Sequence, residues 1–433
     1  MEMAFTVLLL LQLISSLFLA PIFVFAQTDG KVAVGASLSA TAGNNSSWLS
    51  PSGDFAFGFQ KLENNDLFLL SIWFAKIPDR TIVWYANGDR PAPKGSIVNL
   101  TANSGLVLTS PQGEQLWKSD QTVAGVVAHG VMNDTGNFVL EDDKSENLWE
   151  TFKNPTDTML PGQIIERGGK LFSRQSETNY ARGRFELDFQ EDGNLVFSAK
   201  KPFYSTATTT GTVPGSEGKQ LVFNDSGNFY ILRVNGGRFT FTADERPARD
   251  YYLRSTLNFD GVLAQYFLPK SPFVGNASWK PLWSEPDNIC QKVNSGTGVC
   301  GTNSICTLNA DQRPTCECPR GYSLLDPNDP YGSCNPDFRQ GCEDLYDVQV
   351  LANTDWLTPG YELLKDSTAD KCNKSCFQDC LCDVAIYSNE TCWKKKLPLS
   401  YGREDSSFNA KTFIKFRKDN STPPCPSSYN GAA

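Results

Sequence analysis

The sequence predicts a mostly β protein in which two tandem, repeat-built domains precede a disulfide-rich half. Strand-length apolar runs, separated by Gly, Asn, Asp and Pro, fill the first 280 residues. Short units recur within that stretch, and all 13 cysteines lie between Cys290 and Cys425. A chain of 433 residues is too long for one hydrophobic core, so several domains are expected.

The N-terminal segment is typical of a targeting peptide. Residues from Phe5 to Phe25 are almost wholly apolar, and Val24-Phe25-Ala26 places small residues where a signal peptidase reads. We therefore expect a signal peptide over residues 1–26, cleaved after Ala26. Because the first residues carry Glu2 and no basic side chain, an uncleaved anchor is the open alternative.

An internal repeat organises the first half. SGLVLTSPQGEQLWKS at Ser104–Ser119 aligns without a gap to GNFVLEDDKSENLWET at Gly136–Thr151, and the unit opening recurs as DGNLVF at Asp192–Phe197 and SGNFYI at Ser226–Ile231. Such hairpins cannot bury their apolar faces alone and must assemble around a shared axis. We expect that axis to be filled by Trp73, Trp84, Trp117 and Trp149. Recurrence on both sides of Thr151 predicts two domains, divided near Leu148–Gln163.

These motifs resemble those of a known family. The GN-[LF]-V turns followed by Leu-Trp are similar to the repeat of bulb-type (mannose-binding monocot) lectins. IVWYAN at Ile82–Asn87 and LWETFKNPTDTMLPGQ at Leu148–Gln163 resemble elements of the extracellular region of plant G-type lectin S-receptor-like serine/threonine-protein kinases. The resemblance covers nearly the whole mature chain. It implies two β-prism domains, over residues 27–152 and 153–284 (the S-locus region), each with three small sheets around a pseudo-threefold axis.

One candidate sugar site follows from this resemblance. Bulb-type lectins hold mannose with Q-x-D-x-N-x-V-x-Y, and the copy here consists of Gln190, Asp192, Asn194 and Val196, with Ser198 at the Tyr position. Because alternate residues of a strand share one face, we expect these side chains in one row. Two other copies have diverged, and their aligned residues are Asn133, Thr135, Asn137, Val139 and Glu141, and Asn224, Ser226, Asn228, Tyr230 and Leu232. Since D-G-N also favours a tight turn, hairpin closure is the structural alternative.

The cysteines form two groups of six, with Cys425 left over. CGTNSIC and CECPRGY resemble an EGF-like module, expected over residues 286–335. That resemblance implies the bridges Cys290–Cys306, Cys300–Cys316 and Cys318–Cys334. KCNKSCFQDCLC places Cys372, Cys376 and Cys380 on one face of a short helix and resembles a PAN/apple module, expected over residues 342–418. Here the resemblance implies Cys372–Cys392 and Cys376–Cys382, which leaves Cys342–Cys380.

Dense cysteines and sequons both indicate an exported protein. Cysteines confined to one region are typical of disulfides in an oxidising compartment, whereas zinc is disfavoured by the absence of nearby histidine. Predicted N-glycosylation sites are Asn44, Asn45, Asn99, Asn133, Asn224, Asn276, Asn373, Asn389 and Asn420. The Pro/Ser-rich residues 419–433 are expected to form a stalk. We expect a secreted or cell-surface protein, membrane-anchored only if a span follows in a longer chain.

Composition argues against several function classes. The net charge is −9 and the basic residues form no run, which disfavours nucleic acid and anionic lipid. His129 is the single histidine. Because histidine is the commonest general base and metal ligand, general-base catalysis and metal binding are disfavoured, and we expect no metal ion or cofactor. No Gly-rich phosphate loop, HRD or DFG motif is present. A glycosidase using Asp188 and Asp192 is the remaining enzymatic alternative.

We therefore predict a binding protein and not an enzyme. The resemblance implies an extracellular recognition module in plant defence signalling. The expected partner is an extracellular protein or peptide, a second copy of the chain, or a receptor. The alternative is a mannose-type lectin acting through Gln190–Val196.

Overall fold

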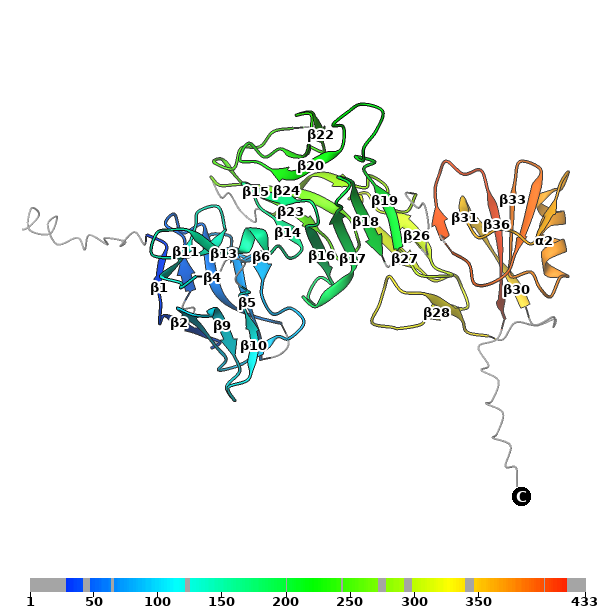
Figure 1. Ribbon diagram of the computed structural model, residues 1–433. Coiled ribbons are helices and arrows are strands. Elements are labelled where there is room, and N and C mark those ends of the chain that lie inside the picture. Colours follow the sequence, from blue (N-terminus) through cyan, green and yellow to red (C-terminus); the bar gives the residue numbers. More distant parts are fainter. Residues whose placement is uncertain are drawn as a thin grey trace, which may run out of the picture.

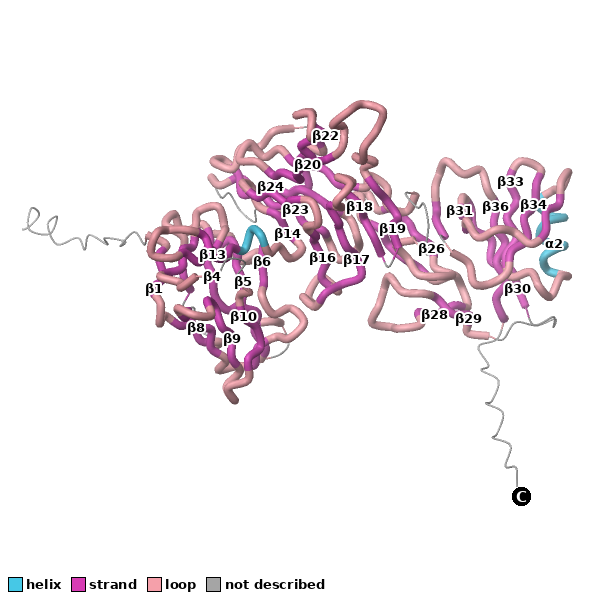
Figure 2. The backbone as a smooth tube through the Cα atoms, viewed as in Figure 1, coloured by secondary structure: helices cyan, strands magenta, loops and turns pink. Residues whose placement is uncertain are grey.

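The computed structural model describes residues 29–41, 47–63, 66–120, 125–199, 201–242, 244–271, 278–291, 298–338, 346–400 and 402–418. It is an elongated row of β-rich modules that runs from the blue N-terminal sheets to the orange and red C-terminal module (Figure 1). Strands are the main regular elements throughout the described residues (Figure 2). The predicted mostly β fold class is confirmed. The predicted signal peptide and stalk lie outside the described residues.

Three antiparallel sheets form the first β-prism. The first sheet contains β1 (Lys31–Ala33), β11 (His129–Met132), β12 (Phe138–Glu141) and β13 (Asn147–Glu150). The second contains β2 (Ser37–Ser39), β8 (Ile97–Thr101), β9 (Gly105–Thr109) and β10 (Gln115–Lys118). The third contains β3 (Ser47–Leu49), β4 (Phe55–Lys61), β5 (Leu67–Phe74), β6 (Ile82–Tyr85) and β7 (Ala92–Pro93).

Three tryptophans, one from each sheet, meet on the axis of this prism. Trp84 of β6, Trp117 of β10 and Trp149 of β13 contact one another edge to face, with ring centroids 5.9–6.0 Å apart. The aromatic quadrupole favours this edge-to-face geometry, which stabilises the prism beyond the effect of burying the rings. The prediction that Trp73 also fills this axis is wrong. Its neighbours Ile72 and Phe74 belong to the core, and alternation along β5 turns Trp73 to the other face.

The third sheet also supplies a repeat unit that the sequence comparison missed. Strand β5 and the Trp84-bearing β6 correspond to β9–β10 and β12–β13. The connection from Ala75 to Thr81 is longer than the matching turns, so an ungapped comparison does not align this copy.

The second β-prism repeats the plan with three four-stranded sheets. The first sheet contains β14 (Thr158–Met159), β23 (Tyr251–Leu257), β24 (Leu263–Pro269) and β25 (Lys280–Glu285). The second contains β15 (Gln163–Glu166), β20 (Gly218–Phe223), β21 (Phe229–Arg233) and β22 (Arg238–Thr240). The third contains β16 (Lys170–Arg174), β17 (Arg182–Phe189), β18 (Leu195–Ala199) and β19 (Lys201–Ser205). Its core is rich in phenylalanine. Trp283 there packs on Phe229 and Phe241.

The segment between the prisms, residues 148–163, holds both together. It includes the 3-10 helix η1 (Thr151–Lys153). The carbonyl of Asn154 accepts the Trp84 indole N–H at 2.7 Å, and Gln163 donates to the carbonyl of Phe152 at 2.8 Å. Asp157 is buried and pairs with Arg174 at 3.2 Å. The residues of the LWETFKNPTDTMLPGQ element therefore have a structural role and connect the two prisms.

The C-terminal half combines two disulfide-rich modules. Its strands are β26 (Ile305–Leu308), β27 (Pro314–Glu317), β28 (Tyr322–Leu324), β29 (Cys334–Pro336), β30 (Tyr346–Ala352), β31 (Thr354–Trp356), β32 (Glu362–Leu364), β33 (Val384–Ser388), β34 (Thr391–Lys395), β35 (Gly402–Glu404) and β36 (Lys411–Arg417). Helix α2 (Ala369–Phe377) packs on the sheet β30-β36-β33-β34-β32. Strand β26 pairs in parallel with β35, so one mixed sheet joins the two modules.

The structure joins the same cysteine pairs that the family resemblance implies. These are Cys290–Cys306, Cys300–Cys316, Cys318–Cys334, Cys372–Cys392 and Cys376–Cys382. Cys380 is also disulfide-bonded, while Cys342 and Cys425 lie outside the described residues. The expected helix is shorter than predicted. It ends at Phe377, so Cys380 lies beyond it and only Cys372 and Cys376 share a helical face.

Candidate functional site

The candidate sugar motif is divided between a turn and a strand. Only Val196 and Ser198 lie in β18, whereas the first three motif residues form the turn between β17 and β18. The amide of Gln190 donates to the carbonyl of Asn194 at 2.9 Å, and Gly193, with φ +82°, lets the chain reverse there. The expected single row of five strand residues is therefore not formed.

The polar groups of the motif are partly engaged within the chain. Asp192 is exposed, but its Oδ1 accepts the amide of Asn194 at 3.0 Å. The Asn194 Oδ1 accepts the Thr206 hydroxyl at 3.5 Å and the Thr208 amide at 3.3 Å. Val196 is only 4 % exposed, which leaves little of it for a sugar ring to contact.

A similar arrangement, which we call the hydroxyl clasp, recurs in the first prism: a turn Asn accepts a hydrogen bond from a hydroxyl, and that hydroxyl accepts a strand amide. This arrangement explains the repeated Asn. Asn137 Oδ1 accepts the Thr151 hydroxyl at 3.0 Å, and Thr151 in turn accepts the amide of Phe138 at 2.9 Å. Hydroxyls at matching positions accept the first strand amide in three other units, those of Ser119, Thr206 and Thr242. The hydroxyl thus pins all four hairpins, and a turn Asn bonds to it in two of them, at Asn137 and Asn194. This recurring hydroxyl is a sequence signal that the initial comparison overlooked.

An ion network lies on the sheet face beside the motif. Lys170 pairs with Glu186 at 2.6 Å and Asp188 at 3.2 Å, across strands β16 and β17. Asp188 lies opposite Val196, and Glu186 lies opposite Ser198. The pKa of Lys170 is raised, chiefly by its bond with Glu186. Asp188 therefore acts as a counter-ion to Lys170.

The other predicted site residues lie in structural positions. His129 pairs across β11 and β12 with Glu141 at 3.1 Å. Asn133 and Asn224 begin the turns that match Gln190, and the Asn224 side chain already accepts the amide of Asn228. Of the remaining sequons, Asn389 is exposed, Asn99 and Asn373 are half-buried, and Asn44, Asn45, Asn276 and Asn420 lie outside the described residues.

A second candidate site, missed from sequence, lies on the C-terminal module. We call it the Asp379 surface, formed by Tyr361, Glu362, Asp379, Leu381 and Lys394. Asp379 accepts the Tyr361 hydroxyl at 2.7 Å and pairs with Lys394 at 2.6 Å. Lys394 also pairs with Glu362 at 2.5 Å. Beside this network lies an open hollow of about 650 Å³, whose rim includes Leu381.

The Asp379 network predicts an acid-sensitive component of stability. Hydrogen bonds from Lys394 and Tyr361 lower the pKa of Asp379 from 3.8 to about 2. Because the folded-state pKa is depressed, this stabilisation is present above pH 3.8 and is lost as pH falls from 3.8 toward 2. We expect Asp379→Asn to lower the free energy of unfolding at pH 7 but to have little effect at pH 2, as measured by urea unfolding. An equal effect at both pH values would contradict this assignment.

In the ranges that the structure describes, three or more His, Cys, Asp or Glu side chains are nowhere grouped so as to hold a metal ion. Within those same ranges, every helix is too short or too polar to cross a membrane.

The sheets and turn motifs define a bulb-type lectin fold, and two family profiles agree with it. A profile of the D-mannose binding lectin family matches residues 81–180, and one of the S-locus glycoprotein domain matches residues 216–325. Among solved structures, a monocot mannose-binding lectin from Gastrodia elata is 18 % identical with a TM-score of 0.22, covering 31 % of this chain and 99 % of its own. The two-domain Scilla campanulata agglutinin is 14 % identical with a TM-score of 0.19, covering 58 % and 93 %.

The sequence relatives name the family. RLK1 of Arabidopsis thaliana, a G-type lectin S-receptor-like serine/threonine-protein kinase, is 40 % identical over 94 % of this chain and 53 % of its own length. LECRK4 of Oryza sativa subsp. indica is 38 % identical over 91 % and 51 %. The chain is homologous to the extracellular half of these receptor kinases. It spans about half the length of the curated relatives it matches.

Proposed function

We propose that this chain is an extracellular recognition module that binds a protein or peptide at the plant cell surface, through its C-terminal module. The observation that carries the proposal is the Asp379 surface. Leu381 there is 64 % exposed, beside a tyrosine and an ordered ion network. Large exposed apolar side chains rimmed by polar groups are typical of protein interaction sites.

The geometry of the sugar motif supports the same choice. Asn194 holds its own loop, and Val196 is covered. A sugar would have to compete with these internal hydrogen bonds, which lowers the net gain from each new contact. The motif residues therefore favour a retained scaffold over an active monosaccharide site.

The alternative is a mannose-type lectin acting through Gln190, Asp192, Asn194, Val196 and Ser198. It is supported by the near-complete motif and by the exposed carboxylate of Asp192. Relatives of the fold are also named mannose-binding lectins.

One paired experiment separates the two functions. The full chain is probed with a displayed random-peptide library and with an array of mannose-type glycans, as wild type, Leu381→Asp and Asp192→Ala. We expect enriched peptides that lose affinity about tenfold or more with Leu381→Asp and keep it with Asp192→Ala, as for a hot-spot residue. Glycan binding that Asp192→Ala abolishes would instead favour the lectin function, and a chain that binds neither probe would contradict both.

A second copy of the chain is one protein partner within this proposal. Sedimentation of wild type beside Leu381→Asp tests it, because loss of a dimer in the variant places that contact on the Asp379 surface. The proposal also places the recognition event in defence signalling, on the family resemblance. A plant immune response that does not change when the chain is supplied would contradict that part.

A further inference from the structure

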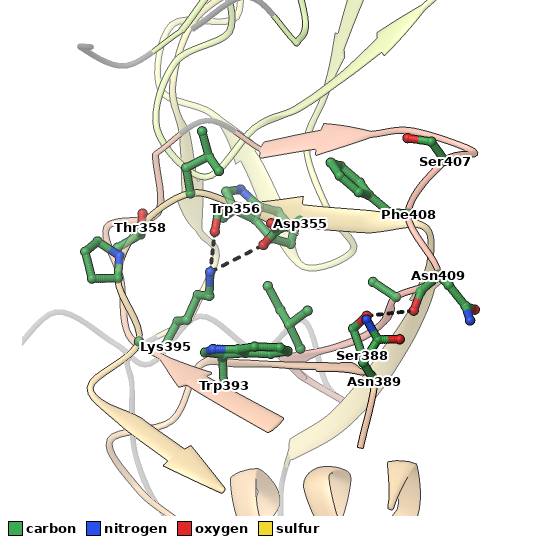
Figure 3. Close-up of a pocket in the computed structure, with 15 residues that line it drawn as sticks. Asp355, Trp356, Thr358, Ser388, Asn389, Trp393, Lys395, Ser407, Phe408 and Asn409 are labelled. Atoms are coloured by element: carbon green, nitrogen blue, oxygen red, sulfur yellow. Dashed lines mark hydrogen bonds and ion pairs between the residues drawn. The ribbon is translucent and has the colours of Figure 1, made fainter. Parts of the chain in front are cut away.

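A second pocket lies beside the hairpin formed by β33 and β34. Its volume is about 620 Å³, within the range of small-ligand sites. Trp393 of β34 and Phe408 contribute aromatic walls, while Ser388 and Asn389 close one end (Figure 3). The Ser388 hydroxyl donates to the carbonyl of Asn409 at 3.0 Å and holds that end together. The pocket is thus a preformed hollow with both aromatic and polar walls.

A glycosylation sequon forms the turn at the edge of this pocket. Asn389-Glu390-Thr391 follows β33, and Ser388 pairs with Thr391 across the two-residue turn. Asn389 and Glu390 have φ of +47° and +59°, a tight hairpin conformation that Asn tolerates well. The Thr391 hydroxyl donates to the carbonyl of Asn389 at 3.2 Å. The turn therefore holds an exposed, sequon asparagine at the pocket.

The chemistry of the walls fits a sugar. An indole face is electron-rich and attracts the weakly positive C–H groups of a pyranose ring. The hydroxyl of Ser407 and the amide of Asn409 can exchange hydrogen bonds with sugar hydroxyls. The cation at the far side, Lys395, is already bound to the carbonyl of Trp356 and to Asp355, so the pocket does not select for an anion.

We propose that this pocket seats the first sugar residues of an N-linked glycan on Asn389. Its occupant is then part of the same chain, attached at the rim. Alternation along β34 turns Trp393 and Lys395 into the pocket and Lys394 to the opposite side, where it contacts Ser375 of α2. The glycan covers the face of the sheet opposite the Asp379 surface, which it leaves open to partners.

Site-resolved deglycosylation tests the proposal. The full chain is secreted from a host that makes high-mannose glycans and treated, while folded, with an endoglycosidase that cuts within the glycan core. Glycopeptide mass spectrometry follows release at each site. We expect the Asn389 glycan to be released about tenfold faster from Trp393→Ala than from wild type, because the ring no longer shields the core sugars. Release from Asn224, in the second prism, serves as the internal reference.

Matched variants separate shielding from unfolding. Val350→Ala, at an exposed position of β30 in the same module and outside this pocket, should leave the Asn389 release rate unchanged. Trp393→Phe keeps an aromatic wall and should give an intermediate rate with an unchanged melting temperature. A wild-type Asn389 that carries no glycan overturns the proposal. Equal release rates in wild type and Trp393→Ala overturn it as well.

Discussion

Replacing Asp157 with Asn is expected to destabilise the chain by about 3–5 kcal/mol, because a buried ion pair loses one partner. Asp157 is only 2 % exposed and lies 3.2 Å from the guanidinium of Arg174. Burial alone would lower the pKa of Arg174, but the charge of Asp157 raises it above its ordinary value. The two charges thus depend on each other at the junction of the prisms.

A second, half-buried cation increases the expected cost. Burial is the main factor that lowers the pKa of Arg254 to about 10; the charge of Arg174 acts in the same direction, while Tyr266 and Asp157 oppose the shift. Arg254 also lies over the rings of Tyr266 and Trp279, at 4.1 and 4.9 Å. Without Asp157, two neighbouring, half-buried guanidinium groups would keep less compensating charge.

Urea unfolding of Asp157→Asn beside the exposed control Asp143→Asn measures this effect. The control should leave the midpoint nearly unchanged, since surface charges contribute little. A loss below about 1 kcal/mol for Asp157→Asn would mean that the aromatic rings alone stabilise the two cations.

Replacing Trp149 with Ala is expected to cost about 3–5 kcal/mol, the usual range for a large buried ring. Trp149 contacts Trp84 and Trp117 edge to face, with both centroid separations at 6.0 Å. Its loss leaves a cavity on the axis where the three sheets meet, and these sheets cannot close together without breaking their strand pairing. Tryptophan fluorescence during denaturant unfolding would report the transition of the first prism.

The ranking of related variants provides the control. Trp84→Ala should cost about as much as Trp149→Ala because both rings are buried, whereas Trp117→Ala should cost less because that ring is half-buried. Trp149→Phe should recover part of the loss. Equal, small effects at all three positions would show that the axis is not the centre of stability.

Local patterns predicted much of the fold. The ungapped match of Ser104–Ser119 to Gly136–Thr151 identified hairpins, because turn chemistry and a following apolar strand are encoded within a few residues. The sequence repeat does not reveal the unit containing Trp84, because its connecting loop is longer. It does not reveal the hydroxyl clasp either, because Ser and Thr are common in polar turns. The cysteine spacing correctly predicts a helix at Cys372, but the helix ends at Phe377 and does not reach Cys380.

The candidate sugar site shows where local patterns mislead. The Gln190–Ser198 spacing suggested one strand face, yet three of its residues form a turn and Asn194 binds Thr208. The Asp379 surface had no local signature at all. Tyr361, Asp379 and Lys394 come from separate elements and meet only when α2 packs on the sheet.

The sequence by itself determined the β repeats and the cysteine groups, since each depends on residues close together along the chain. Only the tertiary structure decided which hydroxyls clasp which asparagines, that β26 and β35 share one sheet, and that Asn389 lies at an aromatic pocket. These features arise from contacts between distant segments, and such contacts are set by how whole sheets pack and not by any short pattern.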